Sequence, residues 1–167
     1  MKHILVALLL CSAPVHAADL VGRATVIDGD TIDVASTRIR LHGVDAPESS
    51  QLCANAAGVA YRCGQAAALA LADKLGSAPT RCRPRQRDVY GRTIAVCTQD
   101  GASVNAWLVR EGHAVAMVRY SRAYVHLERS ARAARKGMWQ GSAQDPSMYR
   151  RCMKALGARA TTCSVSP

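Results

Sequence analysis

A tight turn between two strand-forming segments, with one cysteine in each segment, constrains the fold of this chain more than any other feature. Asp88-Val89-Tyr90-Gly91 is typical of a type I turn, which favours Asp at its first position and Gly at its fourth. A hairpin folded symmetrically about this turn places Cys82 opposite Cys97, close enough for a disulfide bond. Pro84 in the first arm indicates an edge position or a bulge, and a bulge would shift the register by one residue.

Strand-forming and helix-forming segments follow one another in an order that suits a small barrel. The order is three strands, a helix, the hairpin and two further helices, which predicts an α+β fold: a five-stranded OB-fold-like Greek-key β-barrel with about three packed α-helices. A loop of uncertain structure is expected at 49–62, and a short extended piece at 114–118. The strands are expected at 20–27, 31–34, 38–44, 80–87 and 92–98, and the helices at 64–75, 104–111 and 124–136.

The first 17 residues are expected to be a leader that is removed before folding. An apolar run at 4–10 precedes Val15-His16-Ala17, a small-x-small cleavage pattern, and cleavage after Ala18 is nearly as good. The run is too short for a stable membrane anchor, and no later segment is long and apolar enough to serve as one. These features predict a secreted or periplasmic protein. Its parts are a signal peptide at 1–17, an OB-fold domain at 18–139 and a disulfide-stapled C-terminal tail at 140–167.

The cysteines support export. The leader contains Cys11, so six of the seven cysteines remain in the mature chain, and an even number in an exported protein indicates disulfides. No Cys-x-x-Cys pair occurs and the histidines are isolated, which argues against a zinc site. Besides the hairpin pair, proximity in the sequence suggests that the remaining pairs are Cys53–Cys63 and Cys152–Cys163.

The chain is strongly basic. Its formal net charge is +10, and removal of the leader, which carries Lys2 and no acidic residue, leaves +9. A small exported protein of this charge is expected to meet polyanions such as nucleic acid, acidic polysaccharide or an anionic membrane. Solubility alone would also account for the charge, so composition leaves the function open.

Four carboxylates gather in two short motifs. Asp28-Gly29-Asp30 breaks the first strand, and its two carboxylates face the same way in extended backbone, although a plain Asp-Gly turn is the common alternative. Asp45-Ala46-Pro47-Glu48 ends the third strand at a corner that Pro47 stiffens. If the third strand pairs beside the first, the two motifs meet; otherwise they are polar strand ends. Clustered carboxylates repel one another unless a cation neutralises them, and oxygen donors favour calcium or magnesium.

Two arginines are candidates for binding phosphate. Arg40 lies on the face of the third strand opposite Ile39 and Leu41, and Arg92 follows the hairpin turn. Each is either a solvated strand residue or a guanidinium fork for a phosphate. Further arginines alternate along the first hairpin arm, where they either follow a nucleic-acid backbone or form a solvated edge that opposes aggregation. These are Arg81, Arg83, Arg85 and Arg87.

Together these motifs resemble the staphylococcal-nuclease-like (thermonuclease) family over residues 20–139. The family's fold is the oligonucleotide-binding barrel, in agreement with the element order above. The motifs occur in the family's order and close to its spacing. They are Val26-Ile27-Asp28-Gly29-Asp30-Thr31, Arg40-Leu41 with Val44-Asp45-Ala46-Pro47-Glu48, Asp88-Val89-Tyr90-Gly91-Arg92, and Val104-Asn105 through Leu108-Val109 to Gly112.

The resemblance implies a calcium-dependent phosphodiesterase, an endonuclease-like hydrolase that acts on DNA and RNA and leaves 3′-phosphate ends. Calcium would be bound directly by Asp30, Asp45 and the backbone carbonyl of Ala46, with Asp28 supporting them without touching the metal. Glu48 would position or deprotonate the attacking water.

The resemblance also assigns residues to the substrate. Arg40 and Arg92 would bind the phosphate and stabilise its developing charge, and Tyr90 would lie near the nucleotide. The chain departs from the family's type member after the second helix, where it keeps one tyrosine, Tyr120, and has Val118 in place of the other.

The leading hypothesis is therefore an exported, monomeric, calcium-dependent nuclease without a stable membrane anchor. The alternative is a non-catalytic nucleic-acid-binding OB-fold protein, although such a module has no need of both the carboxylates and the arginines. A third hypothesis is a basic protein that binds the cell envelope.

Overall fold

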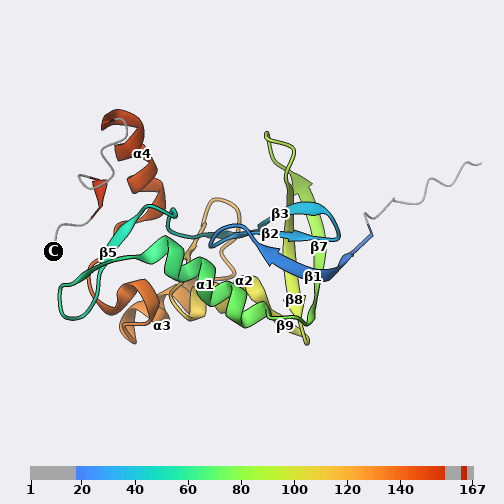
Figure 1. Ribbon diagram of the computed structural model, residues 1–167, viewed down its shortest axis with the longest axis horizontal. Coiled ribbons are helices and arrows are strands. Elements are labelled where there is room, and N and C mark those ends of the chain that lie inside the picture. Colours follow the sequence, from blue (N-terminus) through green and yellow to red (C-terminus); the bar gives the residue numbers. More distant parts are fainter. Residues whose placement is uncertain (1–17, 157–162, 165–167) are drawn as a thin grey trace, which may run out of the picture.

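The computed structural model describes residues 18–156 and 163–164, so the expected leader at 1–17 lies outside the described residues (Figure 1). Five strands form a barrel in the order β3-β2-β1-β7-β8, and a parallel pairing of β3 with β8 closes it. This confirms the α+β barrel. The strands are β1 (Leu20–Val26), β2 (Thr31–Val34), β3 (Thr37–Leu41), β7 (Pro79–Arg87) and β8 (Thr93–Gln99), with β9 (Ala102–Ser103) added beside β8.

The hairpin of β7 and β8 has the expected cysteine register for a reason that differs from the expected one. The arms begin to pair at Arg87 and Thr93, so the turn contains one residue more than a symmetric type I turn. A bulge between Pro84 and Gln86 shifts the register back by one residue. The two deviations cancel, and Cys82 lies opposite Cys97 and is bonded to it.

All three expected disulfides are formed. Besides the hairpin pair, the structure contains Cys53–Cys63 and Cys152–Cys163. The Cys53–Cys63 bond ties the start of α1 to the segment that was expected to be an irregular loop. That segment contains a short antiparallel pair, β5 (Leu52–Ala54) and β6 (Ala60–Arg62).

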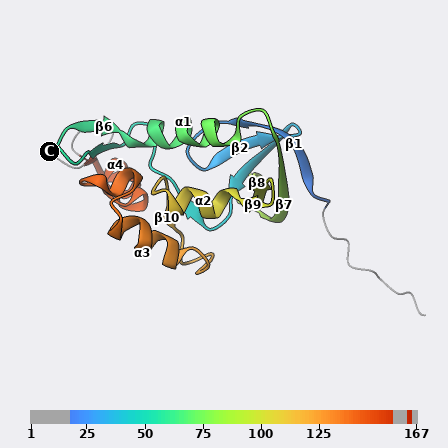
Figure 2. The ribbon, with the colours of Figure 1, turned by 90° about the horizontal axis from the view of Figure 1, so that it is seen from below.

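The described residues contain four α-helices, one more than expected, because the C-terminal tail also contains a helix. Figure 2 shows α1 on one side of the molecule and α2 and α3 on the opposite side. The helices are α1 (Cys63–Leu75), α2 (Val104–Arg110), α3 (Val125–Ala133) and α4 (Pro146–Leu156), with a 3₁₀ turn at Gly137–Gln140; the remaining short strands are β4 (Val44–Asp45) and β10 (Val115–Ala116).

The core lies inside the barrel and beneath the helices. Alternation along β3 buries Ile39 and Leu41, as expected, and leaves Arg40 on the other face. Ser103 caps α2 by accepting a hydrogen bond from the Ala106 N–H at 3.1 Å. None of the helices in the described ranges is both long and apolar enough to cross a membrane.

A buried amide joins α2 to the barrel. The Asn105 side chain donates to the His42 carbonyl at 2.9 Å and accepts from the Cys97 N–H at 2.9 Å. Because Asn105 is fully buried, loss of either bond would leave a backbone group unsatisfied. The helix is thereby fixed against the strand that carries Arg40.

Candidate active site

The first acidic motif is a tight corner between β1 and β2. The Asp28 carboxylate accepts a hydrogen bond from the Asp30 N–H at 3.0 Å, so Asp28 orders the backbone that carries Asp30. A Cβ on Gly29 would lie only 2.6 Å from the Ala46 methyl group. Glycine is therefore required at this position because the second acidic motif packs directly against the first.

The second motif is a rigid corner that packs against the start of α1. The Ala46 N–H donates to Asp30 Oδ2 at 2.8 Å, which joins the two corners directly. A Cβ on Gly64 would lie 1.9 Å from the Glu48 carbonyl oxygen, so only glycine admits the helix here. This packing positions the Glu48 side chain, which is 43% exposed, at the surface of the corner.

Arg40 brings the carboxylates of the two corners together. The third strand does not pair beside the first, which was the condition under which the two motifs were expected to meet; β3 pairs with β2 and β8. Thr31 at the start of β2 instead lies opposite Arg40, and this register places the guanidinium between the corners. Arg40 Nη1 donates to Asp30 Oδ1 at 2.7 Å and Nη2 donates to Asp45 Oδ1 at 2.9 Å.

The positive charge around the buried Asp30 carboxylate is too small to keep its pKa at the ordinary value. Burial raises its pKa from 3.8 to about 7; the Arg40 guanidinium opposes this shift, and the neighbouring Asp28 and Asp45 carboxylates add to it. A single arginine therefore does not compensate for the burial of this carboxylate. A further cation beside Asp30 would be stabilised by the same field.

The residues around Asp30 fit a hard cation. A small cleft of about 20 Å³, close to the volume that one water or ion requires, is lined by both acidic motifs and by Arg40. Asp30 offers carboxylate oxygens at this cleft, and these are the donors that calcium prefers, whereas Asp45 does not line the cleft and pairs with Arg40 and Arg150. Within residues 18–156 and 163–164, no group of three or more His, Cys, Asp or Glu side chains is arranged to hold a metal, so other oxygen ligands would have to complete the coordination.

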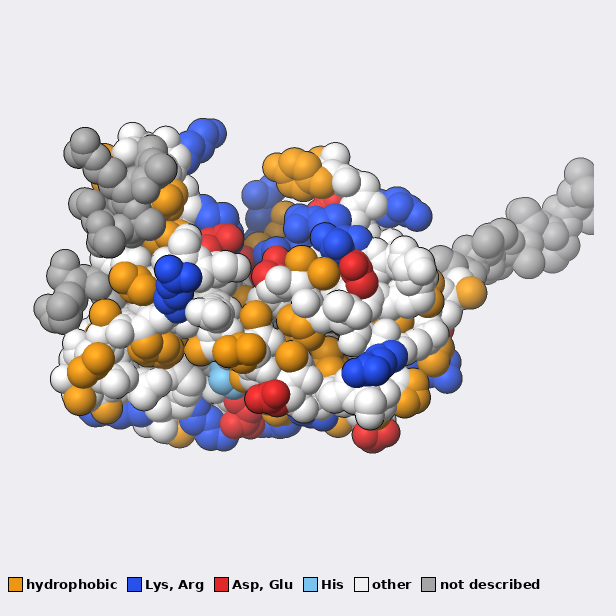
Figure 3. Space-filling view, in the orientation of Figure 1, with side chains coloured by type: hydrophobic (Ala, Val, Ile, Leu, Met, Phe, Trp, Pro, Cys, Tyr) orange, Lys and Arg blue, Asp and Glu red, His pale blue; other side chains and the backbone are white. Residues whose placement is uncertain are grey.

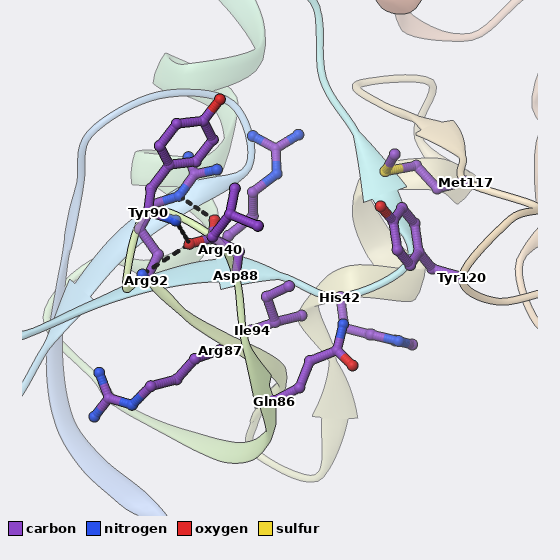
Figure 4. A pocket seen from close by; sticks show the side chains of 12 residues that line it. Arg40, His42, Gln86, Arg87, Asp88, Tyr90, Arg92, Ile94, Met117 and Tyr120 are labelled. Carbon is purple, nitrogen blue, oxygen red and sulfur yellow. Dashed lines mark hydrogen bonds and ion pairs between the residues drawn. The ribbon is translucent and has the colours of Figure 1, made fainter.

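A larger pocket of about 340 Å³ lies on the other side of Arg40. In Figure 4, Tyr90 and Arg92 line one side of this pocket and Tyr120 and Met117 line the opposite side, with Arg40 between them. The structure therefore places both expected arginines and both expected tyrosines around one cavity. Its volume falls in the range of small-molecule sites.

Asp88 orients Arg92, which the sequence did not indicate. Its carboxylate accepts from Arg92 Nε at 2.6 Å and from the Arg92 N–H at 2.9 Å (Figure 4). The Arg92 guanidinium carbon lies 5.6 Å from the centre of the Tyr90 ring. Within the described residues Arg92 makes no hydrogen bond with the acidic corners, and it lines the pocket from the hairpin side.

The two tyrosines are available for stacking. Tyr90 is 81% exposed and Tyr120 is 49% exposed, and both rings line the pocket. Val118 is also exposed but does not line it. An exposed aromatic ring next to an arginine is the usual platform for a nucleic-acid base.

The arginine stripe of the first hairpin arm contains three residues instead of the expected four. Arg81, Arg83 and Arg85 line a separate hollow of about 210 Å³, where Asp19 pairs with the first two. Arg87 instead lines the pocket of Figure 4 and donates to the Gly91 carbonyl at 3.0 Å. The bulge at Pro84 interrupts the alternation, which a regular strand would have continued.

One residue of the site was entirely unexpected. Arg150 of α4 donates to the carboxylates of Asp45 and Glu48, although α4 lies in the segment that was expected to be a polar tail. Figure 3 shows a notch between α4 and the tip of the β7–β8 hairpin, with acidic and basic side chains along its floor. Nothing in the local sequence distinguishes Arg150 from the neighbouring basic residues, so this contact could not have been predicted.

A barrel of this topology, with carboxylates and arginines on one side and an aromatic-lined pocket beside them, defines an OB-fold protein with a candidate phosphate-binding site. Residues 38–141 match the model of the staphylococcal nuclease homologue family. The chain belongs to this family.

Three relatives are similar to this chain over most of its length. The chain is 41% identical over 140 residues to the succinoglycan biosynthesis protein ExoI of Rhizobium meliloti. This alignment covers 82% of this chain and 73% of that protein. It is 34% identical over 146 residues to an uncharacterized endonuclease of Escherichia coli O157:H7, covering 83% of this chain and 89% of the relative. It is 32% identical over 165 residues to a micrococcal nuclease of Shigella flexneri, covering 87% and 88%.

Proposed function

We propose that the protein is an exported, calcium-dependent nuclease that hydrolyses phosphodiester bonds in DNA and RNA. The observation that carries the proposal is the position of Arg40. Its guanidinium bonds both acidic corners and also lines the pocket that contains Arg92 and Tyr90. A phosphate between the two arginines would therefore lie beside the carboxylates, and a base attached to it would reach the tyrosines.

The proposed roles follow from the charges at each position. Arg40 and Arg92 donate charge-assisted hydrogen bonds to the phosphate, and these strengthen as negative charge develops during attack. Glu48, exposed on its corner, positions or deprotonates the attacking water. Calcium bound by Asp30, Asp45 and the Ala46 carbonyl would polarise the phosphate and offset its charge. Asp28 holds the Asp30 backbone in place.

The disulfides support the proposed export. Three disulfides link all six cysteines of the mature chain. Such bonds persist in oxidising compartments and are rare in the cytosol. They agree with the leader that the sequence predicts, and purification from periplasm or medium, with the N-terminus sequenced, would test both.

The decisive test is hydrolysis of defined substrates by the purified mature protein. Single-stranded DNA, double-stranded DNA and RNA are incubated with calcium, with magnesium and with chelator, and a Glu48→Gln preparation controls for contaminating nucleases. We expect calcium-dependent cleavage that the chelator abolishes. Tight binding of DNA without cleavage would instead establish the non-catalytic alternative. Because one relative is named for succinoglycan biosynthesis, succinoglycan is included as a further substrate.

A further inference from the structure

Helix α4 lies beyond the segment matched by the family and delivers an arginine to the candidate site. The matched region ends at residue 141, whereas α4 covers Pro146–Leu156. Arg150 Nη1 donates to Asp45 Oδ1 at 3.0 Å and to Glu48 Oε1 at 2.9 Å, and Nη2 donates to Asp45 Oδ2 at 2.7 Å. One guanidinium is therefore hydrogen-bonded to both carboxylates of the second acidic corner.

The position of α4 is set by contacts of residues that precede Arg150 in the chain. The preceding residue, Tyr149, is 2% exposed, and its hydroxyl lies 3.0 Å from the Ser50 hydroxyl. Gln51 Nε2 donates to the Gln144 carbonyl at 2.7 Å, just before the helix begins at Pro146. All these contacts reach the segment directly after Glu48, so the helix and the corner are held as one unit.

The Cys152–Cys163 disulfide adds a covalent link. It joins α4 to the chain around residue 163, and the neighbouring Ser164 hydroxyl accepts from the Leu52 N–H at 3.0 Å. Residues 163–164 therefore lie beside the same loop. The backbone that carries Arg150 is therefore fixed beside the acidic corner.

Glu48 depends on this contact more than Asp45 does. Asp45 is 3% exposed and also pairs with Arg40, so two arginines fix its carboxylate. The Glu48 side chain is 43% exposed, and in the part of the chain that the structure describes its carboxylate makes one hydrogen bond, to Arg150. Without Arg150, Glu48 would be free to rotate into solvent.

We propose that Arg150 is a positioning residue that holds the Glu48 carboxylate beside Asp45 and thereby orients the group that acts on water. This inference rests on the proposed nuclease function. It makes the C-terminal segment, which lies outside the matched region of the family, part of the site. A misplaced acid–base group slows the chemical step more than it weakens substrate binding.

The test is steady-state cleavage of DNA by the mature, disulfide-bonded protein carrying Arg150→Ala. We expect kcat to fall roughly ten- to a hundredfold, with KM changed by less than about threefold, since Arg150 does not line the phosphate pocket. Arg150→Lys keeps the charge but replaces the fork by a single ammonium, and should recover only part of kcat. Arg151→Ala is the matched control: it removes the same charge from the next, exposed residue of α4 and should behave as wild type.

A double-mutant cycle separates positioning from a general effect on structure. Once Glu48→Gln is present, adding Arg150→Ala should cause little further loss, because the two residues act as a unit. Fully additive losses would overturn the proposal. Calcium binding, followed by calorimetry, should be retained in Arg150→Ala, since the substitution removes positive charge near Asp45. Loss of calcium binding would show that Arg150 maintains the metal site instead, and would also overturn it.

Two further outcomes are distinguishable. A wild-type protein that cleaves neither DNA nor RNA refutes the proposed function itself. A wild-type protein that cleaves, together with Arg150 variants that equal or exceed it, refutes only the role of Arg150; a gain in activity would mark the contact as inhibitory. Arg150→Lys keeps the test valid if Arg150→Ala fails to fold.

Discussion

The buried carboxylate of Asp30 makes a quantitative prediction about stability. Its pKa lies at about 7 in the folded protein and near 3.8 when exposed, so the folded state binds more protons than the unfolded state between these values. The contribution of Asp30 to the free energy of unfolding is therefore fully present below pH 3.8. It falls as the pH rises above 3.8 and is lost once the pH has passed through 7. At about 1.4 kcal/mol per pH unit, the full loss is on the order of 4 kcal/mol.

The perturbation is Asp30→Asn, measured without metal. An asparagine cannot ionise, so its contribution is independent of pH. Asp30 uses both carboxylate oxygens, one for Arg40 and one for the Ala46 N–H, whereas asparagine has one side-chain oxygen. The lost acceptor lowers the free energy of unfolding by about 1–3 kcal/mol at every pH. The informative quantity is therefore how the difference between wild type and variant changes with pH.

The assay is denaturant unfolding in excess chelator, followed by tryptophan fluorescence between pH 5 and pH 8. We expect the free energy of unfolding of the wild type, relative to Asp30→Asn, to fall by roughly 2–3 kcal/mol across this range. Calcium added at pH 8 should then stabilise the wild type and not the variant, because a ligand that binds only the folded state raises its stability. A difference that stays constant with pH would refute the reasoning about Asp30.

Three further predictions concern the site and the hairpin. Glu48→Gln should lower kcat about a hundredfold or more and leave the melting temperature close to wild type, because the side chain is 43% exposed; near-normal turnover would exclude Glu48 from the reaction. Arg92→Ala should lower kcat/KM at least about a hundredfold, and an equal loss in the stripe variant Arg83→Ala would show that only overall charge matters. Replacing Cys82 and Cys97 by alanine should lower the free energy of unfolding by about 3 kcal/mol, as expected for a link across 15 residues; a loss below about 1 kcal/mol, measured by denaturant titration, would contradict this estimate.

Features that depend on neighbouring residues were predictable. The alternation of β3, the cap at Ser103 and the three disulfide pairs all follow from local composition or short separations in the sequence. The barrel class follows from the order of such elements. Even here the agreement at Cys82 came from two compensating shifts, a longer turn and a bulge, which cancel by geometry that the sequence does not show.

The acidic site was predictable in its residues but not in its assembly. The two acidic motifs were recognised, yet they meet because Arg40 pairs opposite Thr31 on β2, not because β3 lies beside β1. Local sequence patterns do not predict which strands become neighbours, because strand pairing depends on closure of the whole sheet. The loss of Arg87 from the arginine stripe has a similar cause, because one bulge reverses the face of every residue beyond it.

The sequence by itself determined the chemistry available to this protein: carboxylates at two turns, arginines on a strand and a hairpin, and cysteines at separations suited to disulfides. Only the tertiary structure decided which of these groups share a site. Arg150 lies 102 residues beyond Glu48, and its contact depends on a helix held by a buried tyrosine and a disulfide. Such a contact arises from packing between distant segments, and packing is a property of the folded chain that local residue patterns do not encode.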